Sequence, residues 1–314
     1  MPKNIRVYSG TSNPQLAQEI ADYLEMPLGD IEISRFPDGE IFVQYKENIR
    51  RADVYIIQPT SSPTNDNLME LLIMIDAAKR ASAARITAVL PFYGYARQDR
   101  KDRPRVPITS KLVANLLVTA GVDRIITMDL HSQQIQGFFD IPVDHLYAAP
   151  VIVPYLKEKL GKNAVVVAPD SGSVKMANAY AMKLDAGLAV VAKRRIDAES
   201  VESSHLVGDV AGRTCVITDD LTSTAGTLLG AAEQLKKAGA GDIYVAVSHC
   251  LLNDAGVERI KNSEIIKEMV TTNGVKFDAD TDNKVIQLSI APLLGEAIRR
   301  INEGRSVSTL FNYS

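Results

Sequence analysis

The stretch Thr214-Cys215-Val216-Ile217-Thr218-Asp219-Asp220-Leu221-Thr222-Ser223-Thr224-Ala225-Gly226-Thr227 gives the strongest indication of how this chain folds. An apolar strand is expected over Thr214–Asp219, so that two adjacent acids, Asp219 and Asp220, stand where it ends. A loop of hydroxyl-bearing and small residues follows, and the apolar spacing after it predicts a helix over Gly226–Lys237. The first N–H groups of a helix lack partners within it, and the helix dipole is positive there. The loop is therefore suited to binding an anion.

The side chains of this loop suit a phosphorylated sugar. Gly226 lets a ligand approach the backbone closely. Four hydroxyl groups can donate to phosphate oxygens: those of Thr222, Ser223, Thr224 and Thr227. The neighbouring carboxylates can accept sugar hydroxyls or bind Mg2+. The alternative is an ordinary capped helix after a buried strand, but the combination of acids, hydroxyls and glycine favours the phosphate site.

The composition indicates a globular chain of about two domains. The chain has 314 residues, of which 46% are apolar and 23% are charged. The formal net charge of −3 argues against a nucleic-acid partner, and no apolar run is long enough to cross a membrane. Cys215 and Cys250 lie in apolar runs, which is typical of buried hydrophobic residues and not of a disulfide or zinc site. We expect a cytoplasmic protein.

Short β-branched runs alternate with amphipathic stretches along the chain. The predicted strands are Ile5–Tyr8, Val54–Gln58, Arg85–Leu90, Arg124–Asp129, Ala164–Ala168, Ala189–Lys193, Thr214–Asp219, Asp242–His249 and Lys284–Ser289. The predicted helices are Gln15–Leu24, Asn67–Ala81, Ser110–Thr119, Ala149–Lys159, Ser173–Leu184, Gly226–Lys237 and Pro292–Asn302. This order predicts an α/β fold of mainly parallel sheets flanked by helices. We expect two domains, 1–145 and 146–314, with ligands beyond the carboxyl ends of the strands.

A long basic loop is expected between Tyr93 and Pro107. It contains Arg97, Gln98 and Asp99, followed by four further cationic residues in an acidic chain. Guanidinium groups match phosphate oxygens, so the loop is either a solvated excursion or a clamp for a polyphosphate. The segment 36–40, Phe36-Pro37-Asp38-Gly39-Glu40, indicates by itself only a turn between two extended segments.

Polar groups also follow other predicted strands. His131 comes shortly after the strand that ends at Asp129, and Asp170 comes after Ala164–Ala168. A histidine in such a place is more often structural, but acids at several strand ends can converge on one Mg2+ that carries substrate phosphates. The run Lys193-Arg194-Arg195 is either a solvated basic strand end or a set of cations that stabilises charge during phosphoryl transfer.

Taken together, these segments resemble the class I ribose-phosphate diphosphokinases, and the loop after Asp220 resembles that of type I phosphoribosyltransferases. The resemblance extends over essentially the whole chain. Its motifs are the segments 66–72, 95–99, 110–115, 126–131, 134–144, 296–300 and 306–311. It implies two type I phosphoribosyltransferase-like domains, 1–145 on the ATP side and 146–314 on the ribose 5-phosphate side. It also implies a homo-oligomer in which dimers build a hexamer.

The resemblance also implies a role for each matching residue. Lys193 and Arg195 would be catalytic, and His131 and Asp170 would bind Mg2+. The ATP-binding residues would be Phe36, Asp38, Gly39 and Glu40, which reach a neighbouring subunit, together with Arg97, Gln98 and Asp99. The ribose 5-phosphate site would be formed by Arg195, Asp219, Asp220, Ser223, Thr224, Ala225, Gly226 and Thr227. A regulatory site for phosphate or ADP would contain Arg50, Ser82, Gln136, Ser306, Ser308 and Phe311, which are otherwise ordinary interface or loop residues.

The implied reaction is transfer of the diphosphoryl group of Mg-ATP to the 1-hydroxyl of ribose 5-phosphate, which gives 5-phosphoribosyl 1-diphosphate (PRPP) and AMP. Two positions depart from the family pattern. Ser223 stands where the family usually has Asp, and Ser173 stands where the loop after Asp170 usually has its second glycine. We expect both changes to alter sugar-phosphate affinity more than reaction type. The competing functions are a phosphoribosyltransferase, which would not need the turn at 36–40 or the basic loop, and a regulatory subunit without turnover.

Overall fold

The structure is a computed structural model that describes residues 4–194 and 203–311. The chain forms two compact units. The first consists of Met1–Tyr147 with Gly274–Lys276 and Ser289–Asn312, and the second of Ala148–Asn273 with Phe277–Leu288. None of the helices among the described residues is long and apolar enough to cross a membrane.

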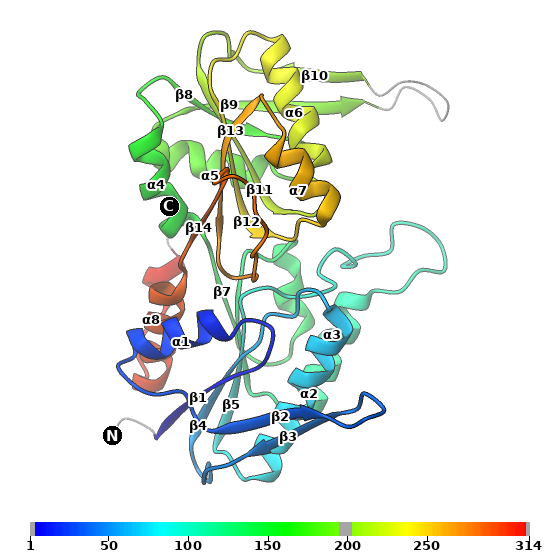
Figure 1. The fold of residues 1–314 in the computed structure, drawn as a ribbon, viewed down its shortest axis with the longest axis vertical. Coiled ribbons are helices and arrows are strands. Elements are labelled where there is room, and N and C mark those ends of the chain that lie inside the picture. The colour runs from blue at the N-terminus through cyan, green and yellow to red at the C-terminus, as the bar shows by residue number, and fades with distance from the viewer. Residues whose placement is uncertain (1–3, 195–202, 312–314) are drawn as a thin grey trace. The chain divides into compact units, whose positions relative to one another are not determined.

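The first unit is built on a five-stranded parallel sheet in the order β1-β4-β5-β6-β7 (Figure 1). Its strands are β1 (Ile5–Ser9), β4 (Asp53–Ile57), β5 (Arg85–Leu90), β6 (Arg124–Met128) and β7 (Val143–Leu146). The central strands are buried along nearly their whole length, as expected for a parallel sheet covered on both faces. Its helices are α1 (Pro14–Tyr23), α2 (Thr64–Arg80), α3 (Thr109–Ala120), α8 (Ala291–Glu303) and the short 3-10 turns η1 (Gln133–Phe138) and η2 (Ser308–Phe311).

A separate β-hairpin extends from the first unit. It consists of β2 (Ile31–Arg35) and β3 (Ile41–Tyr45), which pair in antiparallel register. The inward-facing side chains of both strands pack on the hydrophobic core between the sheet and α2. The hairpin is therefore held at its base by apolar burial, while the turn that joins its strands lies at the surface.

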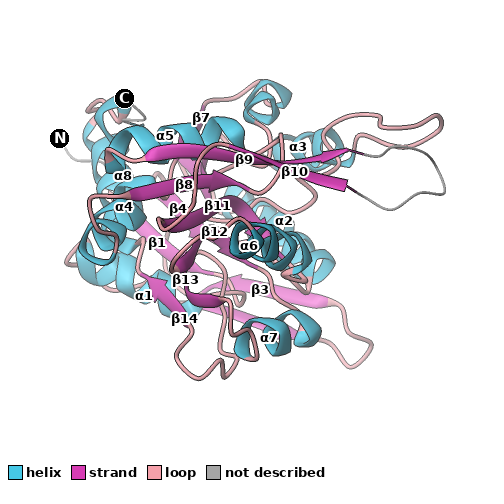
Figure 2. Ribbon diagram, turned by 90° about the horizontal axis from the view of Figure 1, so that it is seen from above, coloured by secondary structure: helices cyan, strands magenta, loops and turns pink. Residues whose placement is uncertain are grey.

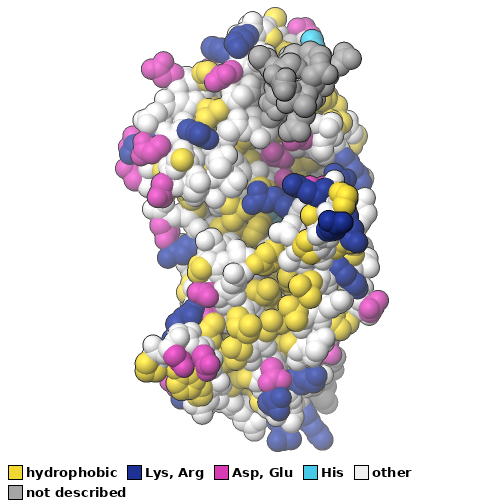
Figure 3. Space-filling model, turned by 90° about the vertical axis from the view of Figure 1, so that its right-hand side faces the viewer, with side chains coloured by type: hydrophobic (Ala, Val, Ile, Leu, Met, Phe, Trp, Pro, Cys, Tyr) yellow, Lys and Arg dark blue, Asp and Glu magenta, His cyan; other side chains and the backbone are white. Residues whose placement is uncertain are grey.

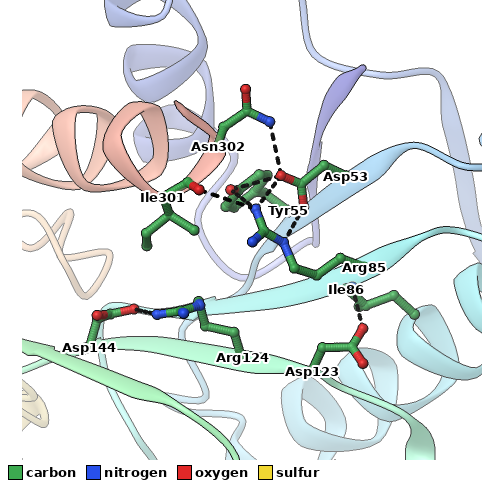
Figure 4. Close-up of polar contacts among 9 residues, drawn as sticks. All are labelled: Asp53, Tyr55, Arg85, Ile86, Asp123, Arg124, Asp144, Ile301 and Asn302. Carbon is green, nitrogen blue, oxygen red and sulfur yellow. Dashed lines mark hydrogen bonds and ion pairs between the residues drawn. The ribbon is translucent and has the colours of Figure 1, made fainter. Parts of the chain in front are cut away.

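The C-terminal helix α8 packs on the first unit through a buried polar network (Figure 4). The carboxylate of Asp53 is fully buried and accepts from Arg85 Nε at 2.7 Å and from Asn302 Nδ2 at 2.9 Å. Tyr55 donates to the same carboxylate at 3.2 Å, and the Arg85 guanidinium also donates to the carbonyl of Ile301 at 3.5 Å. A buried carboxylate needs such partners, so this network fixes the end of α8 against β4 and β5.

The second unit is built on a seven-stranded sheet in the order β10-β9-β8-β11-β12-β13-β14 (Figure 2). Its strands are β8 (Ala164–Ala168), β9 (Gly187–Arg194), β10 (Ser203–Val207), β11 (Thr214–Thr222), β12 (Ile243–Cys250), β13 (Ile266–Thr272) and β14 (Val285–Leu288). All neighbours pair in parallel except β10 with β9. Its helices are α4 (Ala149–Lys159), α5 (Val174–Leu184), α6 (Gly226–Lys237) and α7 (Asp254–Lys261), of which α6 and α7 share one hydrophobic core with the sheet.

The strand order of the second unit reverses between β8 and β11. From β8 the chain moves outward to β9 and β10, whereas from β11 it moves in the opposite direction to β12, β13 and β14. In open α/β sheets, ligands bind beyond the carboxyl ends of the strands at such a reversal, because the connections on the two sides diverge there. This point of the second unit carries both Asp170 and the acids of β11.

The predicted fold class, an α/β fold of mainly parallel sheets flanked by helices, is confirmed. The packing units differ from the expected ranges, because residues 274–276 and 289–311 pack with the first unit although they lie within the expected second domain. For the C-terminal segment the apolar face of α8 causes this, since it packs on α1, where Tyr23 contacts Gly295 and donates to Glu296 at 3.3 Å. Elements β7, β10, β13 and α7 were not predicted, and β2 and β3 were expected only as two extended segments around the turn at 36–40.

Candidate functional site

The loop between β11 and α6 forms a backbone cradle. Helix α6 begins at Gly226 as predicted, and its first internal bond runs from the Leu229 N–H to the Ala225 carbonyl at 2.9 Å. The three preceding N–H groups, those of residues 226–228, therefore lie outside the helical ladder. That of Gly226 donates to Thr224 Oγ1 at a long 3.5 Å, and groups of this kind at a helix N-terminus can donate to an anion. Ala225 has φ 58° and ψ 3° and is buried, so a non-glycine residue is held in the left-handed region. Such strain costs about 1 kcal/mol and is concentrated at binding loops.

The expected end of the preceding strand was wrong. Strand β11 continues to Thr222, so Asp219 and Asp220 lie within it and not at its end. The extension exists because β12 continues to pair with it as far as Thr222↔Cys250, whereas β8 pairs with it only as far as Ile217↔Val167. Beyond Ile217 one edge of β11 therefore borders the loop after β8.

Helix α7 braces the cradle from a region that sequence analysis missed. The N–H of Asn253 donates to the carbonyl of Ser223 at 2.9 Å, and Arg259 Nη1 donates to the carbonyl of Thr224 at 3.0 Å. Gly256 lies so close that a Cβ there would be 3.0 Å from the Ser223 carbonyl oxygen. The guanidinium of Arg259 also lies near Gly226, so it adds positive charge beside the helix N-terminus.

We expect Arg259→Ala to weaken the binding of inorganic phosphate to the cradle about tenfold, because the loop loses a charge-assisted hydrogen bond. The matched control is Lys261→Ala on the same helix, since Lys261 pairs instead with Asp280 at 2.8 Å. Titration calorimetry of both variants with phosphate tests this role, and equal dissociation constants in the two would contradict it.

Two carboxylates meet at the reversal between β8 and β11. Asp170, in the loop after β8, accepts from the N–H of Gly172 at 2.8 Å and of Ser173 at 3.1 Å. The hydroxyl of Ser173 donates to Asp219 Oδ1 at 2.7 Å and lies 3.2 Å from Asp170 Oδ1. Asp219 Oδ1 also accepts from the N–H of Asp220 at 3.0 Å. The structure thus brings together Asp170, Asp219 and Asp220, which were predicted from the sequence, and adds Ser173 to them.

Asp219 has an unusual electrostatic environment. Burial raises the pKa of Asp219 to about 7, and the neighbouring charges of Asp220 and Asp170 add to the rise. The hydrogen bond from Ser173 opposes this shift because it stabilises the ionised form. A carboxyl group with so high a pKa at a strand reversal is typical of a functional site.

The basic run at 193–195 lies partly outside the described residues. Lys193 lies on β9, where its backbone pairs with that of Ser204 on β10. Arg195 lies outside the described residues. The catalytic roles of Lys193 and Arg195 therefore stay predictions.

In the first unit, the basic loop is tied together at its base. Gln98 accepts from the hydroxyl of Thr109 at 2.5 Å, and its carbonyl accepts from the N–H of Ser110 at 3.1 Å. A Cβ at Gly94 would lie 2.5 Å from the Thr60 carbonyl oxygen, so only glycine fits this close approach. Arg97 is exposed beside this base. These bonds hold Gln98 at the base of the loop.

The turn that carries His131 is also held by specific bonds. Asp129 is buried with φ 37°, and its N–H donates to the carbonyl of Leu146 at 3.0 Å. The N–H of Leu130 donates to Nε2 of the buried His145 at 2.9 Å. His131 itself is exposed.

The turn at 36–40, which joins β2 and β3, lies at the surface. Phe36 is 51% exposed and stacks edge-to-face on Phe42. Gly39 has φ 95°, a conformation that glycine adopts without strain, and the Asp38 carboxylate accepts from the N–H of Glu40 at 3.3 Å. An exposed aromatic ring beside two acids on a projecting turn is available to a ligand or another chain.

The residues expected in a regulatory site lie in three places of the first unit. The N–H of Arg51 donates to the carbonyl of Ser82 at 2.9 Å, which brings Ser82 next to the segment that contains Arg50. Gln136 lies 3.2 Å from Nδ1 of His145. The hydroxyls of Ser306 and Ser308 lie 2.7 Å apart in the segment that includes η2, and η2 packs on β7. The side chain of Phe311 lies outside the described residues.

Parallel sheets, a phosphate-type loop at a helix N-terminus and acids at a strand reversal are typical of a phosphate-binding α/β enzyme. Residues 5–121 match the N-terminal domain of ribose phosphate pyrophosphokinase, and residues 202–312 match the phosphoribosyl synthetase-associated domain. The chain belongs to the ribose-phosphate pyrophosphokinase family of enzymes.

Known relatives match over nearly the full length. The ribose-phosphate pyrophosphokinase of Chlorobaculum tepidum is 51% identical over 99% of this chain and 96% of its own length. That of Clostridium tetani is 50% identical over 99% of this chain and 98% of its own. The crystal structure of phosphoribosylpyrophosphate synthetase from Mycobacterium smegmatis is 44% identical, covers 96% of this chain and 100% of its own, and has a TM-score of 0.91.

Proposed function

We propose that this enzyme transfers the diphosphoryl group of Mg-ATP to the 1-hydroxyl of ribose 5-phosphate, which gives PRPP and AMP for nucleotide synthesis. The observation that carries the proposal is the junction of the 222–227 cradle with Asp219 at the strand reversal of the second unit. The cradle would hold the 5-phosphate through the N–H groups of residues 226–228 and the hydroxyls of Ser223, Thr224 and Thr227. Asp219 and Asp220 would accept the ribose hydroxyls.

Catalysis in this proposal consists of positioning and charge stabilisation. The ribose 1-hydroxyl attacks the β-phosphorus of ATP, the bond from that phosphorus to the α-phosphate oxygen breaks, and AMP leaves. Little covalent participation by the protein is needed, so the enzyme must align the oxygens and offset the developing negative charge. Lys193, Arg195 and Arg97 are the cations assigned to that task. Closure of the basic loop over the nucleotide would exclude water, which otherwise competes with the sugar hydroxyl.

Mg2+ fits the donors that the chain offers. Among the residues described, no group of three or more His, Cys, Asp or Glu side chains gathers to hold a metal ion alone. Mg2+ usually keeps several waters and binds through one or two carboxylates together with substrate phosphates. Asp170 supplies such a carboxylate, and His131 is the second residue assigned to the metal–nucleotide complex. Bound Mg2+ would neutralise charge on the transferred group.

The nucleotide site is proposed to include a second copy of the chain. Phe36, Asp38, Gly39 and Glu40 would reach the adenine of ATP bound to a neighbouring subunit, while Arg97, Gln98 and Asp99 would contact ATP on their own. Figure 3 shows hydrophobic side chains gathered on one face of the first unit. Among the exposed large hydrophobic residues of this unit are Met69 of α2 and Leu112 and Leu116 of α3. Exposed apolar groups of this kind support assembly into dimers and a hexamer. A cytoplasmic location stays a prediction from the sequence.

The substrate requirement tests this function. Purified enzyme supplied with ATP, Mg2+ and ribose 5-phosphate should form AMP and PRPP in equal amounts, as measured by anion-exchange chromatography. Omission of either Mg2+ or the sugar should stop AMP formation. Formation of ADP in place of AMP would contradict the proposal, because it would indicate transfer of one phosphoryl group.

We also propose that inorganic phosphate and ADP bind at the residues expected for regulation, which are Arg50, Ser82, Gln136, Ser306, Ser308 and Phe311. Phosphate should then activate the enzyme and relieve inhibition by ADP, because the two anions would compete for one site. A titration of phosphate from zero to tens of millimolar, with and without ADP, measures this at saturating ATP. Unchanged activity and unchanged ADP inhibition throughout would contradict a regulatory role.

A further inference from the structure

Ser173 connects two functional carboxylates that lie 49 residues apart in sequence. It immediately precedes α5 and is 8% exposed. Its hydroxyl donates to Asp219 Oδ1 at 2.7 Å and lies 3.2 Å from Asp170 Oδ1, while its N–H donates to the same Asp170 oxygen at 3.1 Å. A buried hydroxyl in contact with two carboxylates reduces the repulsion between them and restricts their rotation.

The contacts leave one oxygen of each carboxylate for a ligand. Asp170 Oδ1 is used by the loop and by Ser173, and Asp219 Oδ1 is used by Ser173 and by the N–H of Asp220. Within the described part of the chain, no bond is seen to the Oδ2 atom of either acid. Backbone N–H groups hold the Asp170 carboxylate, whereas the Asp219 carboxylate is held by the Ser173 hydroxyl together with the N–H of Asp220, so Ser173 helps to set where the Asp219 Oδ2 atom points.

The bridge is a feature of this chain and not of the family pattern, in which glycine usually stands at this position. Glycine has no hydroxyl and cannot make either contact. The Ser223 departure lies in the loop that would hold the sugar phosphate. Both departures place a hydroxyl group where the family usually has none, and the hydroxyl of Ser173 contacts Asp219.

We propose that Ser173 is a positioning residue for ribose 5-phosphate, which acts by holding the Asp219 carboxylate in the orientation that accepts a ribose hydroxyl. This proposal rests on the proposed function of the enzyme. Asp219 would contact the bound sugar equally before and during the reaction. Loss of the bridge should therefore weaken sugar binding and leave kcat largely unchanged. The KM for ATP should also stay within twofold of its normal value.

The test compares Ser173→Ala with Ser173→Thr. Ser173→Ala should raise the KM for ribose 5-phosphate about tenfold with kcat within threefold, since one hydrogen bond to a charged group is lost. Ser173→Thr keeps the hydroxyl and should restore most of the affinity. Direct titration calorimetry of ribose 5-phosphate with Mg2+ should show the same order of dissociation constants. Ser171→Ala is the matched control in the same loop, because Ser171 is exposed, and its KM should be normal.

Several results would overturn the proposal. A KM within twofold of normal in Ser173→Ala, a fall in kcat at unchanged KM, or equal defects in the Ala and Thr variants would each exclude a positioning role. If Ser173→Ala does not fold, Ser173→Gly provides the same comparison, because glycine at this position matches the family pattern. Failure of the wild-type enzyme to form PRPP would instead contradict the proposed function, so the two failures are distinguishable.

Discussion

Replacement of Lys193 by Ala is expected to lower kcat by about 100- to 1,000-fold, the typical cost of removing one group that stabilises charge in a transition state. Lys193 lies near the end of β9, on the strand next to β8, which leads to Asp170. An ammonium group there would offset charge on the transferred diphosphoryl group more in the transition state than in the bound nucleotide. The dissociation constant of Mg-ATP, measured by titration calorimetry without sugar, should therefore change by less than about threefold.

The control for charge is Lys237→Ala. Lys237 is an exposed cation at the far end of α6, and its removal changes the net charge equally. Its kcat should equal that of the unaltered enzyme. Normal turnover in Lys193→Ala would remove Lys193 from the mechanism, and loss of ATP binding equal to the loss of kcat would make it a ground-state binding residue instead.

Replacement of Asp219 by Asn is expected to have two opposite effects, the first of which is on the sugar. The KM for ribose 5-phosphate should rise about 10- to 100-fold, because a hydrogen bond to a charged acceptor is exchanged for one to a neutral amide. The Oδ1 atom of Asn can still accept from Ser173 and from the N–H of Asp220, so the local structure should persist. An unchanged KM would show that Asp219 does not contact the sugar.

The second effect of Asp219→Asn is on stability. Because burial raises the pKa of Asp219 from 3.8 to about 7, the folded protein binds this proton more tightly than the unfolded chain does. The stabilisation is complete below pH 3.8 and is lost as the pH rises through 7, where the ionised buried carboxylate costs at most about 4 kcal/mol. Asn has no such loss, so the variant should be more stable than the wild type at pH 8.

Urea unfolding in EDTA without sugar measures this difference. The free energy of unfolding of Asp219→Asn minus that of the wild type should be clearly positive at pH 8 and should shrink at pH 5. An equal difference at both pH values would show that the pKa of Asp219 is not raised. Together the two effects would indicate that the ionised carboxylate of Asp219 lowers the stability of the folded protein but is needed for sugar binding.

The sequence was sufficient for those features that depend on local patterns. The continuous apolar runs of Arg85–Leu90 and Ala164–Ala168 predict strands with the bounds that the structure has, and the glycine after the hydroxyl loop predicts the start of α6. The order of strands and helices was enough to indicate parallel sheets. The site loop was predictable because its residues are contiguous, so that its chemistry can be recognised without tertiary contacts.

The features that sequence analysis missed depend on contacts between distant residues. The Ser173–Asp219 bond joins residues 46 positions apart, and the bond from Arg259 to Thr224 in the 222–227 cradle joins residues 35 positions apart. Strand β11 extends past the expected end only because β12 pairs with it there. Strand β13 contains Lys267 and Glu268 and therefore lacks an unbroken apolar run, although its neighbours in the sheet specify it as a strand. Tertiary packing overrides the local pattern at these positions.

Phosphorus NMR of the enzyme with ATP, Mg2+ and ribose 5-phosphate distinguishes diphosphoryl transfer from other reactions of ATP. Diphosphoryl transfer predicts that the three resonances of ATP are replaced by the single resonance of AMP and a pair of diphosphate resonances on C1 of the sugar, in equal amounts. The appearance of ADP together with free phosphate, or of free diphosphate in place of the sugar diphosphate, would contradict diphosphoryl transfer to ribose 5-phosphate.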